Sequence, residues 1–249
     1  VIYRNCFLEN HVSAGSGGAI YVKVEFVFRA EVGMTGQKYY ILIKDTKLMF
    51  NFVFNFGGGV QLERISQCFI INSSFKHNRA SDYGGAINFK FGRKMFVQNV
   101  RFIRNYAFGG GGLNINDITK CDIVNSSFSR NRADVRGGGV KGYSVTTISM
   151  QKVRFIKNIA DEDAGIYAEH VSNCSVVTSS FVENRALRCM DIECKAVRVQ
   201  KVMFIKNYAS EAVFEVHLGS ICLLEFSSFV RNRHGRVGYF DVRTLTVHN

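Results

Sequence analysis

The sequence repeats the phrase Phe-x-x-Asn at nearly constant spacing. From Asn55 onward, successive asparagines of this motif are 23, 27, 26, 27, 26, 23 and 25 residues apart. A unit of this length cannot bury a core by itself, and a fixed period of roughly 20–50 residues is typical of stacked solenoids. The motif occurs at Phe7–Asn10, Phe52–Asn55, Phe75–Asn78, Phe102–Asn105, Phe128–Asn131, Phe155–Asn158, Phe181–Asn184, Phe204–Asn207 and Phe229–Asn232.

The residues between the motifs alternate as a β-strand does. Ile87, Phe89 and Phe91 alternate with Asn88 and Lys90, and this period of two indicates a strand with one buried face. Helical spacing is not sustained along the chain. Short strands repeated in coils of about 25 residues predict an all-β fold, a single-stranded parallel β-helix of about nine coils.

Stacked coils place equivalent residues in columns, with neighbours about 4.8 Å apart. We expect an internal column of Phe75, Phe102, Phe128, Phe155, Phe181, Phe204 and Phe229. Asparagine tolerates left-handed backbone conformations and can hydrogen-bond its neighbours, so we expect asparagines in that conformation at a tight bend. They form a second column of Asn78, Asn105, Asn131, Asn158, Asn184, Asn207 and Asn232. Glycine pairs such as Gly84-Gly85 free a second corner from Cβ clashes.

The two motifs together resemble the repeats of the chlamydial polymorphic outer membrane proteins, which pair Phe-x-x-Asn with Gly-Gly-Ala-Ile. The second motif is present at residues 17–20 and 84–87 and loosely at 57–60, 110–113 and 137–140, so the resemblance covers nearly the whole chain. It implies a right-handed β-helix displayed at the cell surface and used in adhesion. The glycine step decays after residue 164, which predicts bulkier and less regular corners in the C-terminal coils.

Bulk composition agrees with one continuous β-helix over residues 1–249. The chain is 47% apolar and has no proline, so every backbone N–H can join a ladder. The sequence contains no run of about 18 apolar residues, so it predicts no membrane-spanning helix. Both ends lie inside repeats, so we expect a fragment of a longer protein.

The interval from Asn10 to Asn55 is 45 residues, close to two periods, with no motif at its midpoint. Either one degenerate coil lies there, or one coil carries an insertion around Arg29–Lys38. We favour the degenerate coil.

Four cysteines recur every second coil, at Cys68, Cys121, Cys174 and Cys222, in steps of 53, 53 and 48 residues. Strand alternation turns them inward, and two coils separate them by about 9.6 Å. Disulfides require Cα atoms within about 7 Å, so we expect free, buried thiols. Cys189 and Cys194 are the one pair that sequence distance allows to meet, and Cys6 has no evident partner.

The net charge of +12 favours anionic partners. The second residue after each phenylalanine is predominantly basic, and a further arginine follows the asparagine on alternate coils. Stacking predicts a stripe for a polyanion or an acidic partner, formed by His77, Arg104, Arg130, Lys157, Lys206, Arg231, Arg79, Arg132, Arg185 and Arg233. Glu183 interrupts it. The alternative interpretation is that these cations only keep the sheet face soluble and unpaired.

Some β-helices are polysaccharide lyases or hydrolases, which use clustered carboxylates. The densest acidic cluster here is Asp161-Glu162-Asp163, and Asp82 and Asp134 occupy the same segment of other coils. Stacking of Asp134 on Asp161 makes weak calcium binding conceivable, although solvated turn carboxylates are the simpler interpretation. The six histidines fall on no repeated position. Of the three glycosylation sequons, Asn72 and Asn125 are expected to face inward, which leaves Asn173 as the better acceptor.

The leading hypothesis is a non-catalytic cell-surface or extracellular protein that acts in adhesion or as a structural spacer or filament component. We expect no catalytic residue, metal ligand or cofactor. The expected partners are an acidic glycan, an acidic protein surface or other subunits of a surface assembly, and nucleic acid is disfavoured because few exposed aromatics are available for base stacking. The alternatives are a carbohydrate-active enzyme with its site on the Asp134–Asp163 edge, and a scaffold subunit docked through the basic stripe.

Overall fold

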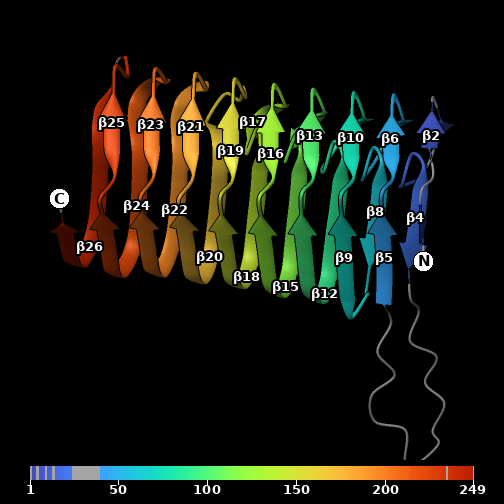
Figure 1. Cartoon of the computed structure of the whole chain (residues 1–249), viewed down its shortest axis with the longest axis horizontal. Helices are drawn as coiled ribbons and strands as arrows, with labels where there is room; N and C mark the ends of the chain where they lie inside the picture. The colour runs from blue at the N-terminus through green and yellow to red at the C-terminus, as the bar shows by residue number, and fades with distance from the viewer. Residues whose placement is uncertain are drawn as a thin grey trace, which may run out of the picture.

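The computed structural model describes residues 2–3, 6–8, 10–12, 15–23, 40–233 and 235–248. These residues form β-strands joined by turns, with no helix that is long and apolar enough to cross a membrane. The coils stack side by side along one long axis, as Figure 1 shows. The predicted parallel β-solenoid is confirmed.

One wall of the solenoid is a parallel sheet of nine short strands, one from each coil. Except for Phe52, each phenylalanine of the motif lies at the centre of one of these strands and pairs with its counterpart, as Phe102 does with Phe128; in the strand of residues 47–49 the central residue is Leu48. The strands are β2 (Cys6–Leu8), β6 (Lys47–Met49), β10 (Ser74–Lys76), β13 (Arg101–Ile103), β16 (Ser127–Ser129), β19 (Arg154–Ile156), β21 (Ser180–Val182), β23 (Met203–Ile205) and β25 (Ser228–Val230).

The remaining walls form a second set of seventeen parallel strands. Towards the C-terminus these strands lengthen and bend around a corner of the coil (Figure 1). The set contains β1 (Ile2–Tyr3), β3 (His11–Val12), β4 (Ile20–Lys23), β5 (Tyr40–Lys44), β7 (Phe52–Val53), β8 (Val60–Glu63), β9 (Gln67–Ile71), β11 (Arg79–Ala80), β12 (Ile87–Gln98), β14 (Tyr106–Gly109), β15 (Leu113–Val124), β17 (Arg132–Arg136), β18 (Val140–Gln151), β20 (Asp163–Val177), β22 (Arg185–Gln200), β24 (Tyr208–Glu225) and β26 (Arg236–His248).

Residues with left-handed backbone conformation make the corners. In one coil these are Arg104, Gly110, Asp117 and Asn125, with φ of 52°, 65°, 52° and 47°. At Gly110 a Cβ atom would lie 2.8 Å from the carbonyl oxygen of Leu113, so glycine is required there. The glycine corner is absent from the three coils after Gly137 and returns at Gly235, with φ of 67°. Register shifts in the β20–β22 and β22–β24 pairings lie at the corners that lack it. The irregular C-terminal corners are therefore confirmed.

The predicted phenylalanine column runs through the core. Successive rings from Phe75 to Phe229 stack with centroids 4.5–5.3 Å apart, and Phe102 and Phe128 are parallel to within 1°. Six of these seven rings are fully buried, and Phe229 is partly buried at the C-terminal end. Aliphatic residues from the other walls pack against them in one continuous cluster.

The asparagines form a buried amide ladder beside the phenylalanines. The side chain of Asn131 accepts hydrogen bonds from the backbone N–H and Nδ2 of Asn105, and it donates to Asn158 Oδ1 and to the carbonyl oxygen of Phe102. The same pattern extends from Asn78 to Asn232. The residue before each asparagine, such as Arg130, takes the left-handed conformation, so the prediction that the asparagine itself does so was wrong.

The prediction of a degenerate coil between Asn10 and Asn55 was wrong. Leu48 pairs with Phe75, and Asn51 donates to Asn78, so the coil is built on Leu48–Asn51 and not on Phe52–Asn55. Phe7 pairs directly with Leu48, which leaves no space for a degenerate coil. The extra length lies between the end of β4 at Lys23 and the start of β5 at Tyr40. The next coil has only residues 64–66 at the equivalent place, and the coil after it continues there in one strand, β12. The insertion considered around Arg29–Lys38 falls in this interval, outside the described residues.

The cysteine column is confirmed. Cys68, Cys121, Cys174 and Cys222 are free and buried, and they alternate with Met95, Ile148 and Val197 in the same register. Cys189 and Cys194 are also free and buried. Burial raises the pKa of the Cys222 thiol to about 11 and that of Cys194 to about 12, so these groups are small apolar fillers rather than nucleophiles. The side chain of Cys6 lies outside the described residues.

The inward orientation expected for Asn72 and Asn125 was wrong. Both side chains are exposed at left-handed corners, where Asn99 donates to Asn72 and Asn125 donates to Asn99. A left-handed residue between two strands interrupts the alternation on which the prediction rested. Asn173 is exposed as well.

Candidate functional site

The predicted basic stripe lies along the corner that follows the nine-stranded sheet. Arg104, Arg130, Lys157, Lys206 and Arg231 are exposed, and each takes a φ of 52–55° that directs its side chain away from the coil. His77 is half-buried because its ring stacks on Phe50 at 4.9 Å. Burial lowers the pKa of His77, as do the neighbouring cations, so the imidazole adds little positive charge at neutral pH.

The second part of the stripe also forms the predicted column. Backbone pairing places the arginines and the residues between them in the order Arg79, Tyr106, Arg132, Ile159, Arg185, Tyr208 and Arg233. The guanidinium of Arg79 lies 4.8 Å from the centroid of the Tyr106 ring, and that of Arg185 lies 5.2 Å from Tyr208. These cation–π contacts hold the arginines flat against the surface while they stay exposed.

Four cations of the same surface were missed. Lys47, Lys76, Arg101 and Arg154 flank the column of large core residues on the outer side of the nine-stranded sheet. The sequence could have shown them, because each lies directly before or after the central apolar residue of a short strand. The neighbours of an inward-facing strand residue must point outward. We call the ten stripe residues and these four the basic face. Among its described columns Glu183 is the one carboxylate, and it forms an ion pair with Lys157 at 3.2 Å.

The opposite charge gathers in a cleft on the outside of the long bent strands. We call it the ionic cleft; its volume is about 340 Å³. Side chains of adjacent strands, rather than long loops, build its walls. It is lined by Arg136 of β17, Tyr167 and Glu169 of β20, Arg188, Asp191 and Glu193 of β22, His217 of β24 and Asp241 of β26.

Arg188 is the centre of the ionic cleft. Its Nε lies 2.9 Å from Asp163 Oδ1 and 3.5 Å from Asp191 Oδ2, and its Nη1 lies 3.5 Å from Glu215 Oε2. Nη2 lies 3.1 Å from Glu162 Oε2, which Arg136 also binds at 2.6 Å. Glu211 is the fifth carboxylate, 3.6 Å from Nη1. One guanidinium therefore compensates several carboxylates from three adjacent coils.

The buried carboxylates of this network hold their protons more tightly than usual. Burial raises the pKa of Asp191 to about 6. Burial, followed by repulsion from Asp191, raises that of Asp163 well above its usual range, although Arg188 opposes the shift. Asp163 Oδ2 is buried without a hydrogen-bond partner, which adds to the cost of ionising this carboxyl group. Burial alone would lower the pKa of Arg188, yet the surrounding carboxylates raise it.

The structure separates the acidic residues singled out from the sequence. Asp163 and Glu162 belong to the Arg188 network, whereas Asp134 accepts a hydrogen bond from Tyr106 and lies 3.9 Å from Arg132. Asp161 is exposed. The proposed calcium pair of Asp134 and Asp161 enters no group of three potential ligands among the described residues.

Sequence reasoning missed most of the ionic cleft. Asp191 and Glu215 occupy one outward column, whose other members include the amide ladder of Gln61, Asn88 and Asn114. The sequence did contain a signal for this column. The first outward-facing residue after each glycine step, or after its equivalent in later coils, is polar in every coil from Gln61 to Glu215. Because this position changes from amide to lysine, tyrosine and carboxylate, no repeated motif marked it.

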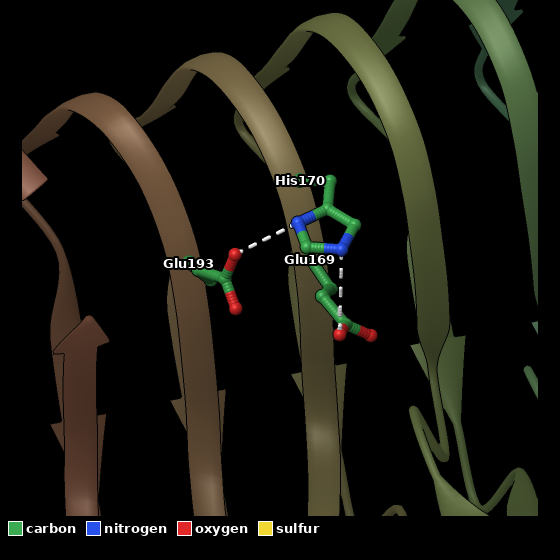
Figure 2. A group of neighbouring side chains, drawn as sticks. All are labelled: Glu169, His170 and Glu193. Atoms are coloured by element: carbon green, nitrogen blue, oxygen red, sulfur yellow. Dashed lines mark hydrogen bonds and ion pairs between the residues drawn. The ribbon is translucent and has the colours of Figure 1, made fainter. Parts of the chain in front are cut away.

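One group at the edge of the ionic cleft has the donor atoms of a metal site. Glu169, His170 and Glu193 each offer a ligand atom, all within 4.8 Å of one another. Figure 2 shows Glu169 and His170 on one coil and Glu193 on the next, with both carboxylates directed at the imidazole.

Comparison with known protein families agrees with this architecture. A family model described as "Right handed beta helix region" matches residues 7–181 and 58–233. Searches of curated proteins and of solved structures give no significant match. The family match spans most of the sequence and coincides with the observed coils, and the chain therefore belongs to the right-handed β-helix family.

Proposed function

We propose that this chain is a non-catalytic β-helix repeat protein of the cell surface or extracellular space, where its basic face binds a linear acidic glycan. The observation that carries the proposal is the alignment of the predicted cations in columns, where all of them except His77 are exposed and Glu183 is the one carboxylate among the described residues of these columns. The resemblance to polymorphic outer membrane repeats supports the location and a role in adhesion or as a structural spacer.

The geometry favours a linear ligand over a compact one. Neighbouring coils repeat the cations at intervals of about 4.8 Å, less than the Debye length of about 8 Å at physiological ionic strength, so their potentials add. A polymer with regularly spaced carboxylates or sulfates can contact many coils at once, and each further contact raises the affinity by avidity. A rigid solenoid also keeps the columns in register without an ordering cost on binding.

The test compares two double charge reversals in binding to polygalacturonate, heparin and neutral dextran. Arg104→Glu/Arg130→Glu alters the basic face at positions where Glu183 shows that glutamate fits the corner. Arg93→Glu/Lys195→Glu makes the same change in net charge at exposed positions on the bent strands β12 and β22. We expect wild-type protein to bind one of the polyanions, the first variant to bind it about tenfold more weakly or worse, and the second to be much less affected. Binding should also weaken with added salt.

Equal binding of dextran, or an equal loss in both double variants, would refute the glycan-binding proposal. Retention of polyanion binding by Arg104→Glu/Arg130→Glu would do the same. If the polyanions do not bind and an acidic protein copurifies through the basic face, the scaffold alternative replaces it.

The ionic cleft supports one competing function, a carbohydrate-active enzyme. A carboxyl group with a pKa of about 6, as at Asp191, is suited to protonate a leaving oxygen, and Arg188 could bind an acidic sugar beside it. This site replaces the Asp134–Asp163 edge considered from the sequence. Incubation with the same polymers separates the two functions, because the binding proposal predicts no shortening of the chains, whereas the enzyme predicts depolymerisation that Asp191→Asn abolishes.

A further inference from the structure

The corner beside the ionic cleft brings two carboxylates from neighbouring coils to one imidazole. His170 Nδ1 lies 2.9 Å from Glu193 Oε1, and its Nε2 lies 3.9 Å from Glu169 Oε1 (Figure 2). The side chains of His170, Glu169 and Glu193 are 55%, 28% and 24% exposed, so solvent and ions reach them.

The backbone explains why these residues converge. His170 occupies a left-handed corner with φ of 54°, at the bend where the preceding coils have Arg64, Phe91, Asp117 and Ser144. Glu169 precedes it on β20, and Glu193 lies at the same bend of β22, next to the register pair formed by Ala168 and Ile192. The next coil also carries a histidine at this bend, because His217 of β24 is the register partner of Glu193, but its imidazole lies 3.5 Å from Asp191 and 3.3 Å from Glu215.

The charges at this corner are incompletely compensated. Among the described residues, neither Glu169 nor Glu193 has a lysine or arginine within ion-pair distance, and the charge of Lys141 acts on Glu169 from beyond that distance. The Tyr167 hydroxyl donates a hydrogen bond to Glu169 Oε2, but it adds no positive charge. His170 is the one ion-pair partner of Glu193 in the described part of the chain. Two like charges on adjacent coils repel each other, and a bound cation would turn that repulsion into attraction.

We propose that Glu169, His170 and Glu193 bind a divalent transition-metal ion, with Zn²⁺ as the representative ion. One imidazole nitrogen and two carboxylate oxygens match the mixed donor sets that zinc accepts, whereas Ca²⁺ takes six to eight oxygens. Zinc bonds of about 2.0–2.2 Å place ligand atoms roughly 3.3 Å apart, so the present separation of up to 4.8 Å must close by about 1.5 Å. Rotation of three partly exposed side chains accomplishes this without moving the strands.

The proposed site has a structural consequence and a chemical one. The ion links β20 to β22, so it stabilises the pairing of two coils where the glycine corner has been lost. Three protein ligands leave zinc at least one open position. Because Glu169 and Glu193 also line the ionic cleft, that position is available to an anionic group of a ligand in the cleft.

The test is calorimetric titration of the whole chain with Zn²⁺, compared with two ligand variants and a histidine control. His170→Ser uses the residue that Ser144 shows to fit this corner, and Glu193→Gln preserves the shape of the side chain. The control His217→Gln removes another histidine that lies 3.5 Å from Asp191 and 3.3 Å from Glu215, carboxylates already paired with Arg188. We expect one equivalent of Zn²⁺ to bind to wild-type protein and to the control, with at least about tenfold to hundredfold weaker binding in the two ligand variants.

Two further measurements separate this site from other metal binding. Co²⁺ should give a visible spectrum without a thiolate charge-transfer band, because the described cysteines are buried. Excess Ca²⁺ should not displace Zn²⁺. The proposal is overturned if wild-type protein shows no saturable Zn²⁺ binding, if His170→Ser binds as tightly as wild type, or if the thiolate band appears. Displacement of Zn²⁺ by Ca²⁺ would also overturn it, because it would show an unselective carboxylate pair.

Discussion

Asn131→Ala is expected to lower the free energy of unfolding by about 3–5 kcal/mol, although the substitution removes no apolar group. The Asn131 side chain accepts from the backbone N–H and Nδ2 of Asn105 and donates to the carbonyl oxygen of Phe102 and to Asn158 Oδ1. Alanine leaves the N–H of Asn105 and the carbonyl of Phe102 without these partners in a fully buried site. Each such buried group costs about 1–3 kcal/mol.

The matched control for the asparagine ladder is Asn99→Gly. Asn99 also bridges two asparagines, Asn72 and Asn125, but in an exposed ladder where water replaces the lost bonds. Glycine retains its left-handed conformation at little cost, so we expect a loss below about 1 kcal/mol. Urea unfolding followed by circular dichroism measures both, since the chain has no tryptophan. Equal losses in the two variants would show that the buried ladder is not a main source of stability.

Arg188→Met is expected to destabilise the chain by about 3–5 kcal/mol at neutral pH, because it leaves the buried carboxylates without their cation. Arg188 is 14% exposed, and its partners Asp163 and Asp191 are almost fully buried. Without it the pKa values of both carboxyl groups must rise further.

The loss of unfolding free energy caused by Arg188→Met should become smaller at acidic pH. Wild-type Asp191 already has a folded-state pKa of about 6, above its ordinary 3.8, so the folded form binds more protons and stability falls as pH rises through that window. Removal of Arg188 strengthens this dependence, so lowering the pH towards about 4 should recover part of the lost stability. Unfolding curves at several pH values measure it.

A neutral version of the network provides the control. Arg188→Met/Asp163→Asn/Asp191→Asn removes the two most buried charges together with their partner, and we expect it to be more stable than Arg188→Met alone. A deficit that does not change with pH, or a triple variant no better than the single one, would refute the ionic account of the ionic cleft.

The columns could be predicted from sequence because they depend on spacing and on strand alternation. Each large apolar residue of the motif has the same surroundings in its coil, so Phe102 and Phe128 must meet once the period is known. The motif spacing gave a wrong assignment at Phe52–Asn55, because the core position accepts more residue types than phenylalanine. The core position needs a large apolar side chain, which Leu48 supplies, whereas Phe52 matches the motif but lies in the outer column that continues to Arg79.

The ionic cleft could not be derived in this way. Arg188 reaches carboxylates on three coils because a long side chain bends towards them, and spacing does not encode that direction. The charged cluster also arises where the repeat changes: Asp191 and Glu215 occupy the column that earlier coils fill with amides. A site whose residues differ from one coil to the next cannot be found by looking for residues that repeat. The basic face was predictable for the opposite reason, because its cations recur.

The account rests on coils that stack in register, and pairwise cysteine cross-linking tests this most directly. Ser127 and Arg154 are register partners on the outer side of β16 and β19, at a distance of about 4.8 Å that a disulfide spans. Ser180 lies one coil further, about 9.6 Å from Ser127, beyond the reach of a disulfide. Peptide mapping after mild oxidation should find a disulfide in Ser127→Cys/Arg154→Cys and none in Ser127→Cys/Ser180→Cys. A bond in the second variant but not the first, or in neither, would contradict the stacked-coil structure.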